Sequence, residues 1–109
     1  FIVVQSISDF LRAISILNFN DLQKQEIADL IFQNLNILSK NCDFELNVLI
    51  TKLIEPNKFF MQVEIIKNNL DDYSRKYLLD FIFYEKEYLE NGFNEDEING
   101  FIKFLSYPR

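Results

Sequence analysis

Hydrophobic residues recur every three or four positions along most of the chain, and this spacing places them on one face of an α-helix. The clearest run lies in residues 20–38, where Ile27, Ile31, Leu35 and Leu38 form a single apolar stripe. Asparagine, aspartate and proline residues between such runs are typical helix caps and stops. The pattern predicts six helices, over residues 6–17, 20–38, 43–54, 57–70, 71–90 and 94–105.

Two of the predicted helix starts carry a paired capping signal. Asn20 is followed three residues later by Gln23, and Asn94 is followed in the same way by Glu97. Such pairs can satisfy each other's free backbone N–H groups at a helix start. Gly92 follows the fifth predicted helix, and we expect it to end that helix in the left-handed conformation that glycine adopts readily.

The residues that make turns are scarce. The 109 residues include only 2 Gly and 2 Pro, whereas β-sandwiches and barrels of this size use many more in their turns. No linker rich in glycine and serine and no repeat period divides the chain. We therefore expect an all-α fold, a compact single-domain bundle of about six helices over residues 1–109. Residues 1–4 fit either a short strand or a helical entry, and the start at Phe1 rather than Met leaves a missing upstream segment open.

Composition narrows the function classes. The 12 Phe and 5 Tyr predict a core rich in aromatic rings. The formal net charge of −6 would repel a nucleic-acid backbone, so we expect a protein partner with a basic surface and no nucleic acid. No apolar run reaches the roughly 20 residues of a membrane-spanning helix, so we expect no membrane partner. With one cysteine, no intramolecular disulfide can form, and we expect a cytoplasmic protein.

Catalytic and metal-binding residues are few. The absence of histidine removes the usual general base near neutral pH and the commonest transition-metal ligand. Cys42 is the only cysteine, and we expect it to be a small buried residue. An EF-hand around Gly92 would place Leu89 and Ile98 at positions that must supply oxygen ligands. We therefore expect a protein that is not an enzyme, with no cofactor and no metal site.

Negative charge is concentrated in one segment. Residues 85–97 carry a charge of −5 and the rest of the chain only −1. The acids in the first turn of the last helix are favoured by its dipole, whereas Glu87 and Glu90 lie near a helix end that disfavours negative charge. Their position indicates either a solvated face or a pad for a basic partner. The acids of the segment are Glu85, Glu87, Glu90, Glu95, Asp96 and Glu97.

Apolar residues lie beside this segment on a second face of the same helix. Leu79 and Phe83 stand four positions apart and are either packed in a central helix or exposed as an anchor for a partner. Glu85 falls within the apolar stripe, so it is either a buried carboxylate that needs a partner or a residue at the margin of the stripe. Asn34 likewise lies in the stripe of the second helix, where a buried amide would fix the pairing of helices.

The stretch from Asp71 to Leu105 resembles the second half of tellurite-resistance TerB-like helical domains, which carry an Asp-Gly turn and a capped acidic helix start. In this chain Asn91 replaces the Asp and the spacing is one residue shorter. The resemblance implies a stress-response domain that binds a cation through its carboxylates, and we keep this as an alternative function.

In size, charge and helical content the chain is similar to bacterial immunity proteins, which cap basic nuclease toxins through a negative surface with aromatic anchors. We therefore expect a non-enzymatic acidic helical protein-binding module. One form of such a module is an immunity- or antitoxin-like inhibitor of a basic protein. A second alternative is an oligomerisation or scaffold domain of a larger protein, and a homo-oligomer stays open. The predicted partner-binding residues are Leu79, Phe83, Glu87, Glu90, Glu95 and Asp96.

Overall fold

The computed structural model describes the backbone of residues 2–106 and the side chains of residues 7–106. This part of the chain is built of helices and contains no strand, so the all-α prediction is confirmed. Residues 2–4 belong to the first helix and not to a strand. The elements are α1 (Ile2–Ser15), α2 (Asp21–Gln33), α3 (Leu35–Asn41), α4 (Asp43–Leu53), α5 (Pro56–Ile66), a short 3₁₀ helix (Lys67–Asn69), α6 (Asp72–Tyr84), α7 (Lys86–Glu90) and α8 (Glu95–Ser106).

The predicted number of about six helices is wrong, because two predicted helices are each broken at one residue. Between α2 and α3, Asn34 leaves the helical conformation with φ −116° and ψ 24°. Between α6 and α7, Glu85 does the same with φ −110° and ψ 37°. The described residues therefore form eight α-helices.

Asn34 does not act as the buried amide that its place in the apolar stripe predicts. Its side chain is exposed, and its amide nitrogen donates a hydrogen bond to the carbonyl oxygen of Leu30 at 2.8 Å. The backbone N–H of Asn34 also donates to carbonyl oxygens in the last turn of α2. Asn34 therefore ends a helix by local hydrogen bonds instead of pairing two helices across the core.

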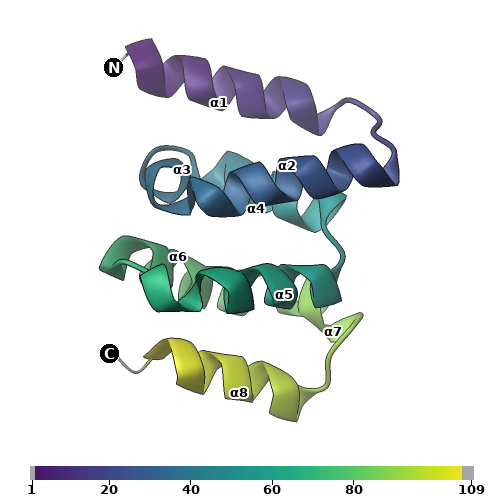
Figure 1. Ribbon diagram of the computed structural model, residues 1–109, viewed down its shortest axis with the longest axis vertical. Coiled ribbons are helices and arrows are strands. Elements are labelled where there is room, and N and C mark those ends of the chain that lie inside the picture. The colour runs from purple at the N-terminus through teal and green to yellow at the C-terminus, as the bar shows by residue number, and fades with distance from the viewer. Residues whose placement is uncertain (1, 107–109) are drawn as a thin grey trace.

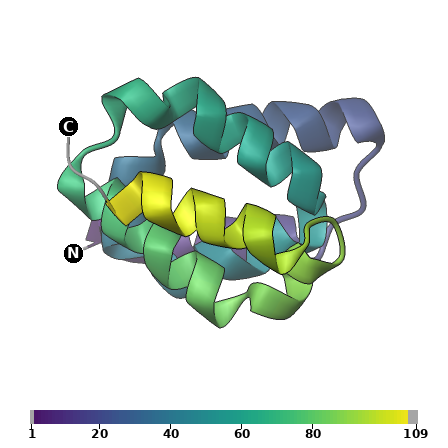
Figure 2. The same cartoon turned by 90° about the horizontal axis from the view of Figure 1, so that it is seen from below.

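The helices are stacked along the longest axis of the molecule, which measures 38 Å, with α1 at one end and α8 at the other (Figure 1). Helix α1 packs on α4, α2 packs on α5, and α8 packs on α6. Seen from the α8 end, α2 and α5 run along one side of the molecule, while α6 and α7 run along the other (Figure 2). The hydrophobic core fills the space between these sides.

Aromatic rings form the centre of the core, as the composition predicts. Phe59 is fully buried and stacks on Phe81 with 4.7 Å between ring centroids. It also meets the rings of Phe32 and Phe60 edge-on, at 5.8 and 5.3 Å. Phe60 stacks on Phe101 and so ties α8 to α5. Edge-on and stacked ring pairs add stability beyond the area that they bury.

Both predicted capping boxes are present. The side-chain oxygen of Asn20 accepts from the backbone N–H of Gln23 at 2.8 Å, and the side chain of Gln23 accepts from the backbone N–H of Asn20 at 3.0 Å. Asn94 and Glu97 make the same two bonds at 2.9 and 3.1 Å. These bonds satisfy N–H groups that have no partner within the helix, which fixes the starts of α2 and α8.

Gly92 does not adopt the left-handed conformation that we expected, because no glycine in the described residues has a positive φ. Its small size serves another purpose. A β-carbon built on Gly92 would lie 3.0 Å from the β-carbon of Pro56. Gly92 therefore lets the turn after α7 approach the first turn of α5 closely.

Cys42 is 2% exposed, which confirms the prediction that it is a small buried residue. It lies between α3 and α4, and the hydroxyl of Ser8 on α1 donates to its sulfur at 3.6 Å. In the described part of the chain, no helix has both the length and the apolar character needed to cross a membrane.

Candidate functional site

The break at Glu85 creates a shallow hollow at the junction of α6 and α7. Its volume is about 460 Å³. Three of the six residues that the sequence predicts for partner binding line it together. The full lining is Phe83, Tyr84, Glu85, Lys86, Glu87 and Glu90.

Two aromatic rings stand out into solvent at this hollow. Phe83 is 70% exposed and Tyr84 is 79% exposed. Tyr84 was not predicted as a site residue, although it adjoins Phe83 in the sequence. Adjacent residues of a helix diverge by about 100°, so a pattern of positions four apart selects Phe83 and passes over its neighbour. Two exposed rings at one place are typical of interaction surfaces.

Leu79 differs from Phe83, although both lie on α6 one turn apart. Leu79 is half-buried and packs against the core. The apolar residues of this second face are divided between the core and the surface. Leu79 therefore packs α6 against the core, and only Phe83 of this pair exposes its side chain to solvent.

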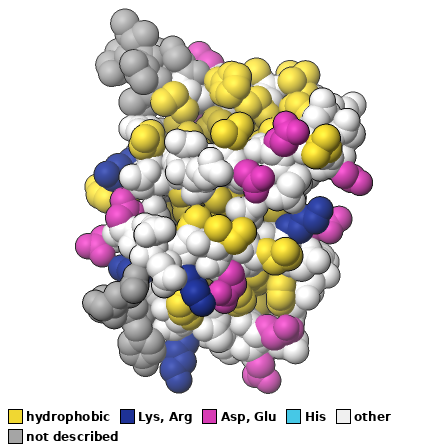
Figure 3. All heavy atoms as spheres, viewed as in Figure 1, with side chains coloured by type: hydrophobic (Ala, Val, Ile, Leu, Met, Phe, Trp, Pro, Cys, Tyr) yellow, Lys and Arg dark blue, Asp and Glu magenta, His cyan; other side chains and the backbone are white. Residues whose placement is uncertain are grey.

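The four acids predicted for partner binding are exposed but fall into two groups. Glu87 and Glu90 line the hollow, whereas Glu95 and Asp96 lie in the first turn of α8, beyond the turn at residues 91–94. On the face shown in Figure 3, acidic side chains gather at the lower edge where α8 begins, and hydrophobic side chains gather over α1 and α2. None of these four acids is within 4.0 Å of a cationic group among the described side chains. Among the side chains that the structure describes, the negative charge of both groups therefore has no ion-pair partner.

Glu85, which we considered as a buried carboxylate, is half-buried. It lies at the helix break and its side chain lines the hollow. Its charge acts on the buried Tyr77: burial is the largest cause that raises the pKa of the Tyr77 hydroxyl, and the charges of Asp43 and Glu85 raise it further. Glu85 therefore contributes its negative charge to the hollow and to the adjacent core.

Among the residues that the structure describes, no three His, Cys, Asp or Glu side chains are grouped so that they could hold a metal ion. The acids of α7 and α8 are separated by the turn between those helices instead of converging on one point.

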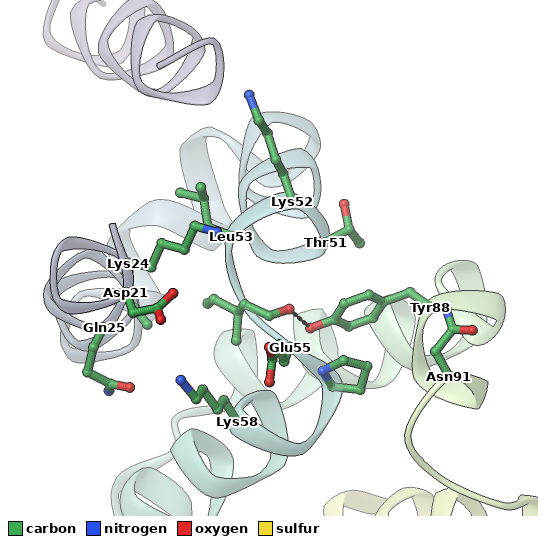
Figure 4. A pocket seen from close by; sticks show the side chains of 13 residues that line it. Asp21, Lys24, Gln25, Thr51, Lys52, Leu53, Glu55, Lys58, Tyr88 and Asn91 are labelled. Carbon is green, nitrogen blue, oxygen red and sulfur yellow. Dashed lines mark hydrogen bonds between the residues drawn. The ribbon is translucent and has the colours of Figure 1, made fainter. Parts of the chain in front are cut away.

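A second, polar pocket was not predicted from the sequence. It has a volume of about 290 Å³ and lies between the start of α2, the end of α4, the start of α5 and α7 (Figure 4). Ala28, Leu53 and Ile54 form a buried apolar floor. The rim carries charged side chains of both signs, which are Asp21, Lys24, Lys52, Glu55 and Lys58.

Tyr88 forms one wall of this pocket and fixes α7 to the link between α4 and α5. Its hydroxyl donates a hydrogen bond to the carbonyl oxygen of Ile54, as Figure 4 shows. Its ring meets the rings of Phe59 and Phe81 edge-on. Burial, followed by the charge of Glu55, raises the pKa of the Tyr88 hydroxyl.

Comparisons of this chain with models of protein families, with curated proteins and with solved structures gave no match. The function is therefore inferred from the surface of the molecule itself. The hollow beside Glu85 joins exposed rings to carboxylates that have no ion-pair partner within the described part of the chain.

Proposed function

We propose that this chain is a non-enzymatic protein-binding module that engages a partner with a basic surface, as an immunity- or antitoxin-like inhibitor does. One observation carries the proposal: at the junction of α6 and α7, the exposed rings of Phe83 and Tyr84 border the same hollow as Glu87 and Glu90. These carboxylates have no ion-pair partner in the described part of the chain.

The two kinds of side chain would contribute differently to binding. Aromatic residues at the centre of an interface supply much of the affinity, because they bury a large area and lose little conformational entropy. Phe83 and Tyr84 fit this role. Carboxylates around such anchors attract and orient a basic partner, and they increase the association rate more than the affinity.

The acids of α8 extend this negative field. Glu95 and Asp96 do not line the hollow, but exposed charges act on a partner over about 8 Å at physiological ionic strength. We therefore assign Glu95 and Asp96 to steering, and Glu87 and Glu90 to direct pairing with lysine or arginine. Leu79 would stabilise the position of α6, which carries Phe83 and Tyr84, by packing against the core.

The test uses short random peptides displayed on phage and selected for binding to the whole chain. Selected peptides should combine lysine or arginine with an apolar residue, and their affinity is measured by fluorescence anisotropy. The double substitution Phe83→Ala and Tyr84→Ala should weaken binding by about tenfold or more. Phe44 is equally exposed on α4, so Phe44→Ala is the matched control and should leave binding unchanged.

Charge is tested separately on the same peptides. The double substitution Glu87→Gln and Glu90→Gln should lower the association rate, and so should an increase of salt from about 50 to about 500 mM. Binding that is insensitive to salt would refute the proposal. Binding that is lost on Phe44→Ala but kept on the double substitution Phe83→Ala and Tyr84→Ala would also refute it.

A further inference from the structure

The polar pocket beside Tyr88 has a charge pattern of its own, which the protein-binding surface does not use. We propose that this pocket binds a small zwitterion with the charges of an α-amino acid and with an apolar side chain. This inference does not rest on the proposed protein-binding function, because the residues that line the two sites are different.

Charged groups of both signs face one space. Lys24 and Lys58 extend from α2 and α5 toward the space that also receives the carboxyl groups of Asp21 and Glu55 (Figure 4). None of these four groups lies within 4.0 Å of an opposite charge on a described side chain. Asp21, Glu55 and Lys58 are exposed, so these charges face solvent around the pocket instead of forming direct ion pairs with described side chains.

A ligand that carries both charges can satisfy both sets of groups at once. Its carboxylate would accept hydrogen bonds from the ammonium groups of Lys24 and Lys58, and its ammonium group would donate to Asp21 or Glu55. A simple anion would instead lie close to two carboxylates, where like charge opposes binding. A simple cation would meet the same difficulty with the lysines.

Part of the pocket lining is suited to an apolar side chain. Ala28, Leu53 and Ile54 are buried at its floor, and the ring of Tyr88 forms one wall. The pocket has a volume of about 290 Å³, which is near the lower end of the range of small-molecule sites, about 300 Å³. This space accommodates a free amino acid such as leucine, and ligand pockets commonly pair an apolar surface with a few charged groups in this way.

The experiment is a titration of the ¹⁵N-labelled chain with L-leucine, followed by NMR. Amide signals of residues around the pocket, such as Lys24, Glu55 and Tyr88, should shift together. N-acetyl-L-leucine lacks the ammonium group and isoamylamine lacks the carboxylate, so each should bind at least about tenfold more weakly. Inorganic phosphate, which offers only negative charge, should bind no better than N-acetyl-L-leucine.

Substitutions test which charged side chains of the pocket bind the ligand. Lys24→Gln with Lys58→Gln should weaken leucine binding at least about tenfold, and so should Asp21→Asn with Glu55→Gln. Lys52 lines the same rim, but its ammonium group points away from the pocket (Figure 4), so Lys52→Gln is the matched control and should bind leucine as the original chain does. Amide signals of residues far from the pocket should keep the positions that they have in the original chain, which shows that each variant is folded.

Three results would overturn the proposal. One is the absence of shifts around the pocket at the highest soluble concentration of leucine. Another is binding of phosphate or N-acetyl-L-leucine that equals the binding of leucine, since the acids would then have no role. The third is leucine binding that the two double substitutions leave unchanged. The double substitution Phe83→Ala and Tyr84→Ala should leave leucine binding unchanged, which separates this site from the proposed protein-binding surface.

Discussion

Gly92 approaches Pro56 so closely that a β-carbon on the glycine would lie 3.0 Å from the β-carbon of the proline. This contact joins the turn after α7 to the first turn of α5. It also lies beside both candidate sites, because α7 contributes Glu87 and Glu90 to one and Tyr88 to the other. The packing of this turn therefore sets the position of residues in both sites.

We predict that Gly92→Ala lowers the free energy of unfolding by about 1–3 kcal/mol, the usual cost of overpacking. Urea denaturation measures the change. Gly100 provides the matched control, because a β-carbon there would meet no atom within 4 Å and Gly100 lies inside α8. Gly100→Ala should raise the free energy of unfolding by about 0.5–1 kcal/mol, since alanine favours helices over glycine. Equal effects of the two substitutions would contradict this account of Gly92.

The stability of the protein should fall as the pH rises above about 10. Burial raises the pKa of Tyr77 and of Tyr88 above the ordinary value of 10.0, so the unfolded chain loses these protons at a lower pH than the folded chain does. The stabilisation is complete below pH 10 and declines above it, by up to about 1.4 kcal/mol per pH unit for each tyrosine. Denaturation at several pH values from 8 upward measures the slope.

Substitution of the two tyrosines separates their contribution to the alkaline loss of stability from the contribution of other groups. Tyr77→Phe with Tyr88→Phe should reduce the slope above pH 10. It should also lower stability at neutral pH, because the hydrogen bonds to Asn47 and to the carbonyl oxygen of Ile54 are lost. An unchanged slope in this variant would show that other groups cause the alkaline loss of stability.

The stabilisation of the start of α6 by Asp71 should depend on pH. Its carboxylate accepts a hydrogen bond from the backbone N–H of Ser74 at 2.8 Å, and this bond is the main cause that lowers its pKa below the ordinary 3.8. A lowered pKa gives stability that is present above pH 3.8 and is lost as the pH falls below it. At neutral pH, Asp71→Ala should cost about 1 kcal/mol.

The control for Asp71 is Asp80, which is exposed on the same helix. Asp80→Ala should change the free energy of unfolding by no more than about 0.5 kcal/mol. Thermal unfolding at pH 7 and at about pH 3 compares the two. A penalty for Asp71→Ala that is as large at the lower pH would argue against the charged cap.

Rings in the core and rings at the surface should differ sharply in their effect on stability. Phe59→Ala should cost about 3–5 kcal/mol, because Phe59 is fully buried among other rings. Phe83→Ala with Tyr84→Ala should change the free energy of unfolding by about 0.5 kcal/mol or less for each residue. Chemical denaturation of the three proteins checks this, and a large loss in the surface variant would mean that these rings support the fold and not a partner.

Much of the fold was predictable from the sequence because its signals are local. The capping boxes at Asn20 and Asn94 depend on residues three positions apart, and both are present. The helix breaks at Asn34 and Glu85 could not be found in this way. Each break takes up a single residue, and hydrophobic residues recur in the sequence on both sides of it, so the spacing alone does not reveal the break.

The candidate sites show the same limit. Phe83, Glu87 and Glu90 lie on one short segment, and a pattern of charge and spacing could select them. Tyr84 borders the same hollow, but a search for apolar pairs four positions apart does not select it. The pocket beside Tyr88 is assembled from several separate segments, and each of these looks like an ordinary helix end in the sequence.

The position of Cys42 makes it a reporter of how α1 is held. It is the only thiol in the chain, and Ser8 of α1 contacts its sulfur, while α1 packs mainly on α4. If α1 detaches before the other helices, a thiol reagent will label Cys42 at a rate set by that local opening and not by global unfolding. The kinetics of a single alkylation would then give the free energy with which the terminal helix is attached.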